Sequence, residues 1–241
     1  MDYSEVRAAF FVPRLDAGPT TGWQSPARRL RDALEPLAAV SFWAEPAYDA
    51  YAALGLNFLT GYVWSRSSVL GLADPAVVAA TFGVFEPAAV AALLTAAREC
   101  CSLEQIRAAR EQGAVDALRE VLPGGDDLGA TTALLRDAAA RADVVGRPLY
   151  AGALGRPAPQ DPHAGLWHTA TVLRECRGDS HLAACVAAGL TGLEANLLTE
   201  LWVGYPALAY ASSRAWSAEA MADAQAALRS RRNADRRESS R

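Results

Sequence analysis

The three histidines of the chain all fall between residues 161 and 190, in the stretch DPHAGLWHTATVLRECRGDSHLAACVAAGL. Within it His168, Thr171 and Glu175 follow a spacing of i, i+3 and i+7, which lines them up along one side of a helix. A carboxylate beside an imidazole fixes the tautomer of the ring and raises its basicity. The stretch therefore predicts a site for acid/base chemistry, with His168 and Glu175 as the reacting pair.

The other two histidines are predicted to lie elsewhere on this segment. A proline at residue 162 predicts a helix start that puts His163 in the first turn, about 140° around the helix from His168. The Arg-Gly-Asp sequence at 177–179 predicts the end of that helix, so that His181 would stand in the first turn of the next one. We expect His163 and His181 to orient polar groups in the site.

A metal or haem site has weaker support from these residues. No HExxH or CxxC spacing brings potential ligands together locally, although a single histidine is enough to hold a haem. The four cysteines include the neighbours Cys100 and Cys101, which favours reduced thiols and a cytoplasmic protein. We predict no cofactor and leave a haem or a divalent metal open.

Further polar residues interrupt apolar helical segments and are candidates for ligand binding. Arg66 and Arg174 are expected to hold an anionic group, because guanidinium groups pair with carboxylates and phosphates. The pocket wall is predicted to include Asn57, Tyr62 and Trp167. Two structural alternatives stay open: a hydrogen-bonded core role for Asn57, and a salt-bridged corner around residues 174–179.

The composition favours helices throughout. Ala, Leu and Val are abundant, and no sustained alternation of apolar and polar residues indicates strands. Helix starts are predicted where proline follows Ser25, Asp74 or Glu86, and Ser102 with Gln105 forms a capping box. We expect an all-α fold, a compact bundle of about nine to eleven helices with an internal pocket and no substantial sheet.

The chain is expected to divide into three parts. Residues 1–24 predict an N-terminal arm, 25–215 an α-helical pocket domain, and 216–241 a terminal helix with an arginine-rich tail. One continuous helix is predicted from residue 46 to 71. Residues 146–160 are rich in glycine and proline, which predicts a loop that covers the pocket as a lid.

Charge and hydropathy limit the partners. All 23 basic residues are arginine, which rules out chemistry that depends on a lysine Schiff base or a phosphate-binding lysine. The net charge of −4 and the pI near 5.5 argue against nucleic acid as a partner, unless the contact is local. No apolar run is long enough to predict a membrane span. A small apolar or aromatic ligand is expected, and a homodimer is left open.

The segment PHAGLWHTATVLRECRGDSHLAACVAAGLTGLEANLL at 162–198 resembles an actinobacterial all-α family of helix-turn-helix or MarR-like proteins, mostly of unassigned function. Shorter matches at 35–56, 61–71, 77–87 and 146–152 support the resemblance. The residues that match the family pattern are His163, His168, Arg174, Glu175, Gly178, Asp179, His181 and Arg66.

Two departures from that family pattern stand out. Family members usually carry a histidine where this chain has Ala38. The family's C-terminal winged helix is expected to begin near Trp216, but residues 216–241 are too few for a recognition helix followed by a β-hairpin wing. We therefore expect this segment to be a remnant of a winged-helix region.

The sequence supports three functional hypotheses. The first is a small-molecule enzyme of secondary metabolism, a cofactor-independent cyclase, isomerase or lyase that uses histidine acid/base chemistry in an apolar pocket. The alternative is a ligand-binding sensor, or a protein related to transcriptional regulators that acts through a partner. The third is an enzyme that depends on a metal or a haem.

Overall fold

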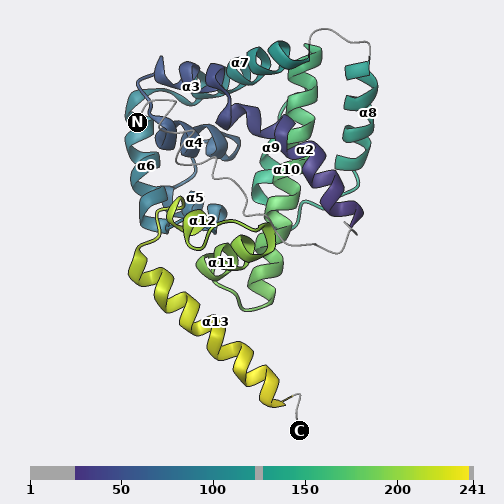
Figure 1. Ribbon diagram of the computed structural model, residues 1–241. Coiled ribbons are helices and arrows are strands. Elements are labelled where there is room, and N and C mark those ends of the chain that lie inside the picture. Colours follow the sequence, from purple (N-terminus) through teal and green to yellow (C-terminus); the bar gives the residue numbers. More distant parts are fainter. Residues whose placement is uncertain (1–24, 123–126, 239–241) are drawn as a thin grey trace.

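One long helix, α10 (Pro162–Ala187), lies at the centre of the fold. The computed structural model describes residues 25–122 and 127–238. Four helices pack around α10: α2 (Pro26–Trp43), α7 (Leu103–Val121), α8 (Asp127–Ala139) and α9 (Pro148–Leu154) (Figure 1). Because most polar residues singled out above lie on α10, its neighbours decide what each of them contacts.

The remaining N-terminal helices form the other half of the body. They are α3 (Glu45–Ala52), α4 (Phe58–Ser67), a 3-10 turn (Ser68–Leu70), α5 (Pro75–Phe82) and α6 (Pro87–Cys100). α3 packs on α7, and both α4 and α5 pack on α6. The prediction of an all-α bundle is confirmed, and the described residues contain no strand.

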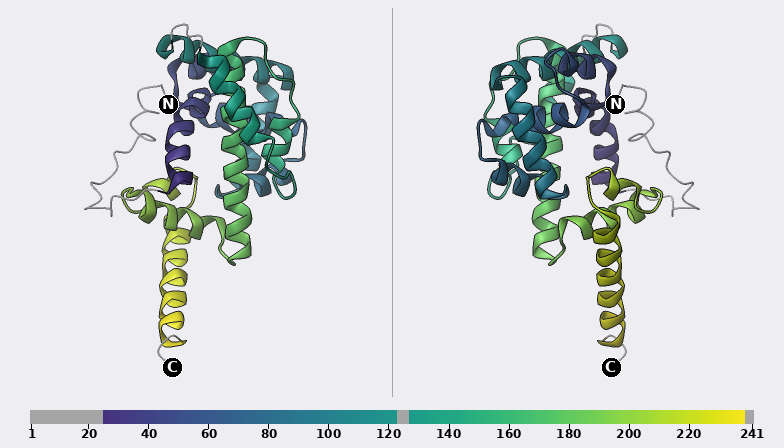
Figure 2. Two further views of the ribbon diagram at one scale, coloured as in Figure 1. Left: turned by 90° about the vertical axis from the view of Figure 1, so that its right-hand side faces the viewer. Right: turned by 90° about the vertical axis from the view of Figure 1, so that its left-hand side faces the viewer.

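Three C-terminal helices complete the chain: α11 (Gly192–Val203), α12 (Ala209–Ser212) and α13 (Ala218–Glu238). The axis turns by 113° between α10 and α11. Gly189 has a φ of 68° at this turn, a left-handed conformation that glycine adopts without steric cost. The first half of α13 packs on α11, Arg231 reaches back to Glu194 and to the Gly189 carbonyl, and the end of the helix extends away from the body (Figure 2).

Helix caps account for most of the helix starts. Side chains of Ser25, Asp74, Glu86 and Asp161 accept hydrogen bonds from first-turn amides, and a proline follows each of them. The capping box predicted at Ser102 is present. These local signals were predicted correctly because each depends only on residues close by in the sequence.

The prediction of one helix over residues 46–71 is wrong. Gly55 has a φ of 78° and separates α3 from α4. Asn57 caps α4, since its Oδ1 accepts the Thr60 amide at 3.0 Å while the Thr60 hydroxyl accepts the Asn57 amide at 2.9 Å. Asn57 is thus occupied by a capping box and lines neither of the two cavities described below.

The predicted loop over residues 146–160 and the predicted helix end at 177–179 are also wrong, and Asp179 is involved in both. The chain forms α9 within 146–160 instead of a loop, and α10 runs through residues 177–179 without a break. Asp179 is buried and its Oδ2 accepts the Tyr150 amide in the first turn of α9 at 2.9 Å. Asp179 therefore caps a helix that is distant in the sequence rather than the one predicted to follow it.

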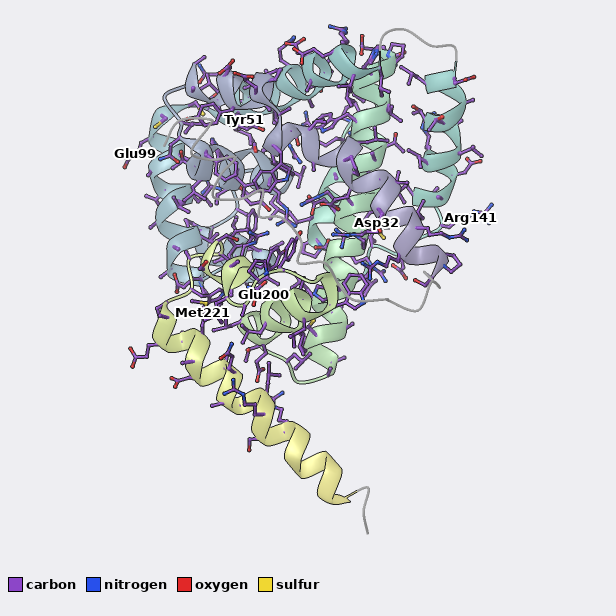
Figure 3. All side chains as sticks on the ribbon, viewed as in Figure 1. Asp32, Tyr51, Glu99, Arg141, Glu200 and Met221 are labelled. Carbon is purple, nitrogen blue, oxygen red and sulfur yellow. The ribbon has the colours of Figure 1, made fainter. Side chains whose placement is uncertain are left out.

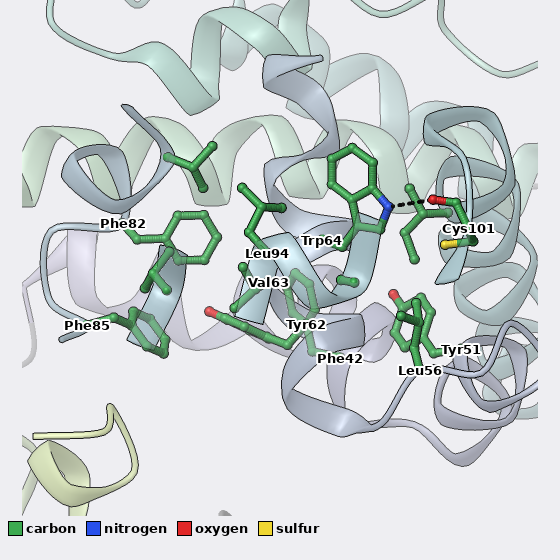
Figure 4. Packing of buried hydrophobic residues seen from close by; sticks show 14 of the residues in the cluster. Phe42, Tyr51, Leu56, Tyr62, Val63, Trp64, Phe82, Phe85, Leu94 and Cys101 are labelled. Carbon is green, nitrogen blue, oxygen red and sulfur yellow. Dashed lines mark hydrogen bonds between the residues drawn. The ribbon is translucent and has the colours of Figure 1, made fainter. Parts of the chain in front are cut away.

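Aromatic side chains form the largest part of the core (Figure 4). Tyr62 packs against Phe42 with ring centroids 4.8 Å apart and against Phe85 at 5.6 Å. Phe82 meets Phe85 at 5.7 Å. These rings connect α2, α4 and α5, so the core extends to the wall of the cavity described below.

No single helix among the described residues is long and apolar enough to cross a membrane. The bent pair made of α10 and residues 192–202 passes the same test by length and composition alone.

Gly113 allows α3 and α7 to approach closely. A Cβ added at Gly113 would lie 2.5 Å from the Cα of Ala47, which is backbone and cannot move aside cheaply. We expect Gly113→Ala to lower the free energy of unfolding by roughly 1 to 3 kcal/mol, the usual cost of overpacking a core.

The control for this prediction is Gly129→Ala in α8. A Cβ at Gly129 meets no atom within 4 Å, so alanine there is expected to raise the free energy of unfolding by about 0.5 to 1 kcal/mol. Urea denaturation of the two variants measures both effects. Equal effects of the two substitutions would contradict the close packing of α3 on α7.

Candidate functional site

A cavity of about 760 Å³ lies among α2, α4, α5, α10, α11 and α12. Its volume is in the range of sites that bind small organic molecules. The aromatic residues of its wall are Trp43, Tyr62, Phe82, Phe85, Trp202, Tyr205 and Tyr210. The arginines of its wall are Arg28, Arg31, Arg66, Arg174, Arg177 and Arg214. We call this space the arginine cavity.

A buried ion pair forms one wall of the arginine cavity. Arg66 on α4 donates from Nε to Glu175 Oε1 at 3.1 Å and from Nη2 to Oε2 at 2.8 Å. Arg174 donates from Nη1 to Glu175 Oε1 at 2.8 Å. Both oxygens of Glu175 thus accept hydrogen bonds from the two arginines. Because Glu175 is only 1% exposed, the carboxylate is paired in a site without solvent.

The ion pair continues into a second carboxylate on α2. Glu35 accepts from Arg174 Nε at 3.1 Å and from Arg177 Nη2 at 2.8 Å. Arg174 thus joins Glu175 to Glu35, and the network fastens α10 to both α2 and α4. The salt-bridged corner that the sequence left open is present for Arg174, Glu175 and Arg177, with Glu35 as an added partner, whereas Asp179 is not part of it.

The network fixes the charges of its members. Burial raises the pKa of Glu175, but Arg66 and Arg174 outweigh burial and lower the pKa to about 2. The pKa of Glu35 is lowered in the same way: burial raises it, but the charges of Arg174 and Arg177 together lower it by more. Burial also raises the pKa of the Tyr62 phenol, and the charge of Arg66 brings it below its ordinary value. Glu175 and Glu35 are therefore both ionised near neutral pH.

Arg214 differs from its neighbours because no carboxylate pairs with it among the described residues. Its guanidinium stacks on Tyr210 at 4.0 Å and on Phe85 at 5.0 Å. Nη1 donates to Ser213 Oγ at 2.6 Å, and the buried Nε has no hydrogen-bond partner. Arg214 therefore offers a charge and a donor to a ligand.

The arginine cavity as a whole is positively charged. Six arginines line it, and three carboxylates, Asp32, Glu35 and Glu175, form ion pairs with members of that set. Three positive charges are left over, next to seven aromatic rings. Such a wall is suited to a ligand that combines an aromatic or apolar body with an anionic group.

Glu200 holds the part of the wall that comes from the C-terminal helices (Figure 3). The Leu208 amide donates to its Oε2 and the Ala211 amide to its Oε1, both at 2.8 Å. Leu208 has a φ of 66°, an unusual value for a residue with a side chain. Glu200 therefore fixes the turn that presents α12 to the cavity.

The predicted site residues are distributed over more than one place. Arg66, Tyr62, Arg174 and His181 line the arginine cavity. His168 and Trp167 line a different cavity, and His163 lines neither. The three histidines are consequently not one cluster.

Each histidine has its own surroundings. A ring nitrogen of His163 lies 2.8 Å from the Leu122 carbonyl, at the contact of α7 with α10. Burial and the nearby Arg177 lower the pKa of His181, and its ring nitrogens lie 3.7 and 3.8 Å from Cys185 Sγ. Burial and Arg110 lower the pKa of His168.

The predicted pairing of His168 with Glu175 is not present. Among the described residues, the side chains that donate to the Glu175 oxygens are Arg66 and Arg174. Arg66 lies on a helix more than 100 residues away in the sequence. Alignment along one helix had suggested the pair, but packing against α4 decides where the carboxylate goes. Among the described residues no group of three His, Cys, Asp or Glu side chains is placed to hold a metal.

Several cavity residues were not singled out from the sequence. Arg177 falls within the corner left open at 174–179, while Glu35 and Arg214 were not predicted as site residues. No local pattern marks them, because they come together only through the packing of α2, α10 and α12.

Comparison with known proteins adds a family. The sequence model of a helix-turn-helix family matches residues 27–239, which is most of the chain. No curated protein and no solved structure matches it. The family match points to a DNA-binding, regulator-like protein, so the prediction of an acid/base enzyme of secondary metabolism is wrong. On this evidence the chain belongs to a helix-turn-helix family.

Proposed function

We propose that the chain is a ligand-responsive regulator, which binds an anionic aromatic small molecule in the arginine cavity and contacts DNA through the basic end of α13. The observation that carries this proposal is the helix-turn-helix family match over residues 27–239. The arginine cavity supports the ligand half of the proposal, since its size and lining suit such a molecule.

The distribution of charge supports α13 as the DNA contact. Residues 229–241 hold six arginines and two carboxylates, a net charge of +4, while the whole chain has a net charge of −4. The other residues therefore carry −8, and attraction to phosphates is concentrated at one end. The negative net charge of the whole chain argues against nucleic acid as a partner, but the local charge of residues 229–241 is positive.

α11 is less suited to this role although it follows a turn of helix-turn-helix geometry. The angle of 113° to α10 and the short connection through Gly189 match that motif. The α11 sequence GLEANLLTELWV, however, contains no basic residue, and its most exposed large side chain is Leu201. The attraction between protein and phosphates comes mainly from cations, and α13 carries them.

Ligand binding is coupled to α13 through the helices that both sites share. Asn196, Trp202 and Arg214 line the arginine cavity from α11 and the segment after α12. α13 packs through Met221 against Leu193 and Leu197 on the adjacent part of α11. A ligand that favours one position of α11 and α12 would therefore favour one position of α13.

The ligand half of the proposal predicts selective binding of an anionic aromatic probe. 8-Anilinonaphthalene-1-sulfonate should bind the full chain more tightly than N-phenyl-1-naphthylamine, which has the same rings without the sulfonate. Arg214→Gln should weaken sulfonate binding about tenfold or more, because a hydrogen bond to a charged group contributes roughly 1.5 to 3 kcal/mol. Probe fluorescence measures both affinities.

A matched control is Arg119→Gln, which removes the same charge from a half-exposed residue outside the arginine cavity. We expect this variant to bind both probes as the unchanged chain does. Equal affinity for the two probes, or equal losses in the Arg214 and Arg119 variants, would contradict an anion-binding role for the arginine cavity.

A further inference from the structure

A second cavity of about 650 Å³ lies beside the N-terminal half of α10, between α7, α9 and the start of α10. Its inner wall includes Arg110 from α7 and Trp167, His168 and Thr171 from α10. None of these residues lines the arginine cavity. We call this space the Arg110 cavity.

Arg110 is a buried cation without a carboxylate partner among the described residues. It is 4% exposed, and its one hydrogen bond runs from Nη1 to the Ser65 carbonyl at 3.1 Å. Glu175 is close enough to influence its pKa, but the Glu175 oxygens are taken by Arg66 and Arg174. An uncompensated buried charge is costly, so this position favours a counterion.

The unsatisfied polar atoms around Arg110 can all donate hydrogen bonds. Nε and Nη2 of Arg110 are both buried without a partner, and so are the Trp167 indole Nε1 and the Thr171 hydroxyl. Nε and Nη2 form the edge of a guanidinium that binds a carboxylate through two parallel hydrogen bonds. The indole and the hydroxyl add two further possible donors.

Aromatic rings hold the guanidinium in place. The Arg110 guanidinium carbon lies 5.2 Å from the Phe42 ring and 5.4 Å from the Trp167 ring. Phe42 also lies 5.1 Å from the Arg174 guanidinium, so it separates Arg110 from the network of the arginine cavity. The fold thus keeps Arg110 fixed on the side of the second cavity.

We propose that the Arg110 cavity binds a small molecule through its carboxylate, which accepts hydrogen bonds from Arg110 Nε and Nη2 and from Trp167 and Thr171. The rest of the ligand lies against the apolar wall of Val69, Val115 and Ala153. Arginines and carboxylates balance at the cavity mouth, where Arg107, Arg119 and Arg156 face Glu104, Glu111 and Asp161. A single carboxylate at Arg110 is therefore the anionic group that the cavity takes.

The proposal concerns a separate cavity and does not depend on the proposed regulatory function. Its experiment uses the indole N–H resonances of the full chain, which has six tryptophans. Trp167→Phe identifies the Trp167 signal. Sodium benzoate should shift that signal in a saturable way, whereas benzamide, the neutral analogue of the same shape, should leave it unmoved. Inorganic phosphate tests whether a tetrahedral anion is accepted instead.

Two variants assign the binding to the named donors. Arg110→Gln should weaken the benzoate response of Trp167 at least tenfold, and Thr171→Val should weaken it about threefold while keeping the shape of the side chain. Arg214→Gln, in the arginine cavity, should leave the response unchanged. The Thr171 variant keeps the test decisive if the Arg110 variant does not fold.

The expected result is a Trp167 shift with benzoate that depends on Arg110 and Thr171 and not on Arg214. No shift with benzoate, or an equal shift with benzamide, would overturn the proposal. A response to phosphate that matches the response to benzoate would overturn the assignment to a carboxylate. A response that depends on Arg214 would place the ligand in the arginine cavity and overturn the second site.

Discussion

Replacing Glu175 with glutamine is expected to lower the free energy of unfolding by about 3 to 5 kcal/mol, because it leaves two buried arginines without their counter-charge. The Arg66 side chain is 10% exposed and the Arg174 side chain 13%, so water cannot take the place of the carboxylate. A loss of this size is a large part of the stability of an ordinary domain. Chemical denaturation measures it.

Glu35→Gln is the matched control. Glu35 also pairs with two arginines, but its side chain is 26% exposed and Arg177 is 46% exposed, so solvent replaces much of the lost interaction. We expect a loss of about 1 kcal/mol. Similar losses in the two variants would contradict the account of the Glu175 network as a desolvated ion pair.

Acidity gives an independent measure of the same network. The pKa of Glu175 is lowered from 4.5 to about 2 in the folded chain, so its contribution to stability is fully present above pH 4.5 and is lost as the pH falls towards 2. A shift of this size corresponds to roughly 3 kcal/mol. The stability difference between the unchanged chain and Glu175→Gln should therefore shrink between pH 4.5 and 2. Parallel pH profiles would contradict it.

The helix starts and the helical class could be predicted from sequence because their causes are local. Capping oxygens at Asp161 and Ser102 act on amides within the next few residues. The break predicted at residues 177–179 fails because a glycine costs only about 1 kcal/mol within a helix, less than the packing of α10 contributes. Asp179 caps α9 from a distance, which no local pattern reveals.

The sequence predicted that polar residues gather on α10, but it did not predict which residues of other helices they contact. The pairing of Arg174 with Glu175 was among the open alternatives, whereas the three histidines lie in separate surroundings. The partners that define each site, Arg66 for Glu175 and Arg110 beside Trp167, come from helices far away in the sequence. The residue pattern on one helix face does not predict which other helix packs against it. In this fold α10 packs against different helices at its two ends.

The second large effect is expected in DNA binding. Arg232→Gln combined with Arg236→Gln removes two of the arginines at the end of α13. If both contact phosphates, the slope of log affinity against log salt should fall by about two, and affinity at low salt should drop on the order of 100-fold. Anisotropy of a labelled duplex measures the slope.

The double variant Arg136→Gln with Arg141→Gln removes the same charge from exposed positions in and after α8. We expect it to change the salt slope little, because those arginines lie away from α13. Equal effects of the two double variants would mean that net charge alone governs binding, which contradicts a contact localised on α13.

The most direct test of the regulatory account is the affinity of the full chain for the duplex that lies upstream of its own coding sequence, measured over a series of salt concentrations. The account predicts binding at low salt whose log affinity falls linearly with log salt, and a shift of that affinity when the arginine cavity is filled by the naphthalene sulfonate probe. Absence of salt-dependent binding at low salt would contradict it.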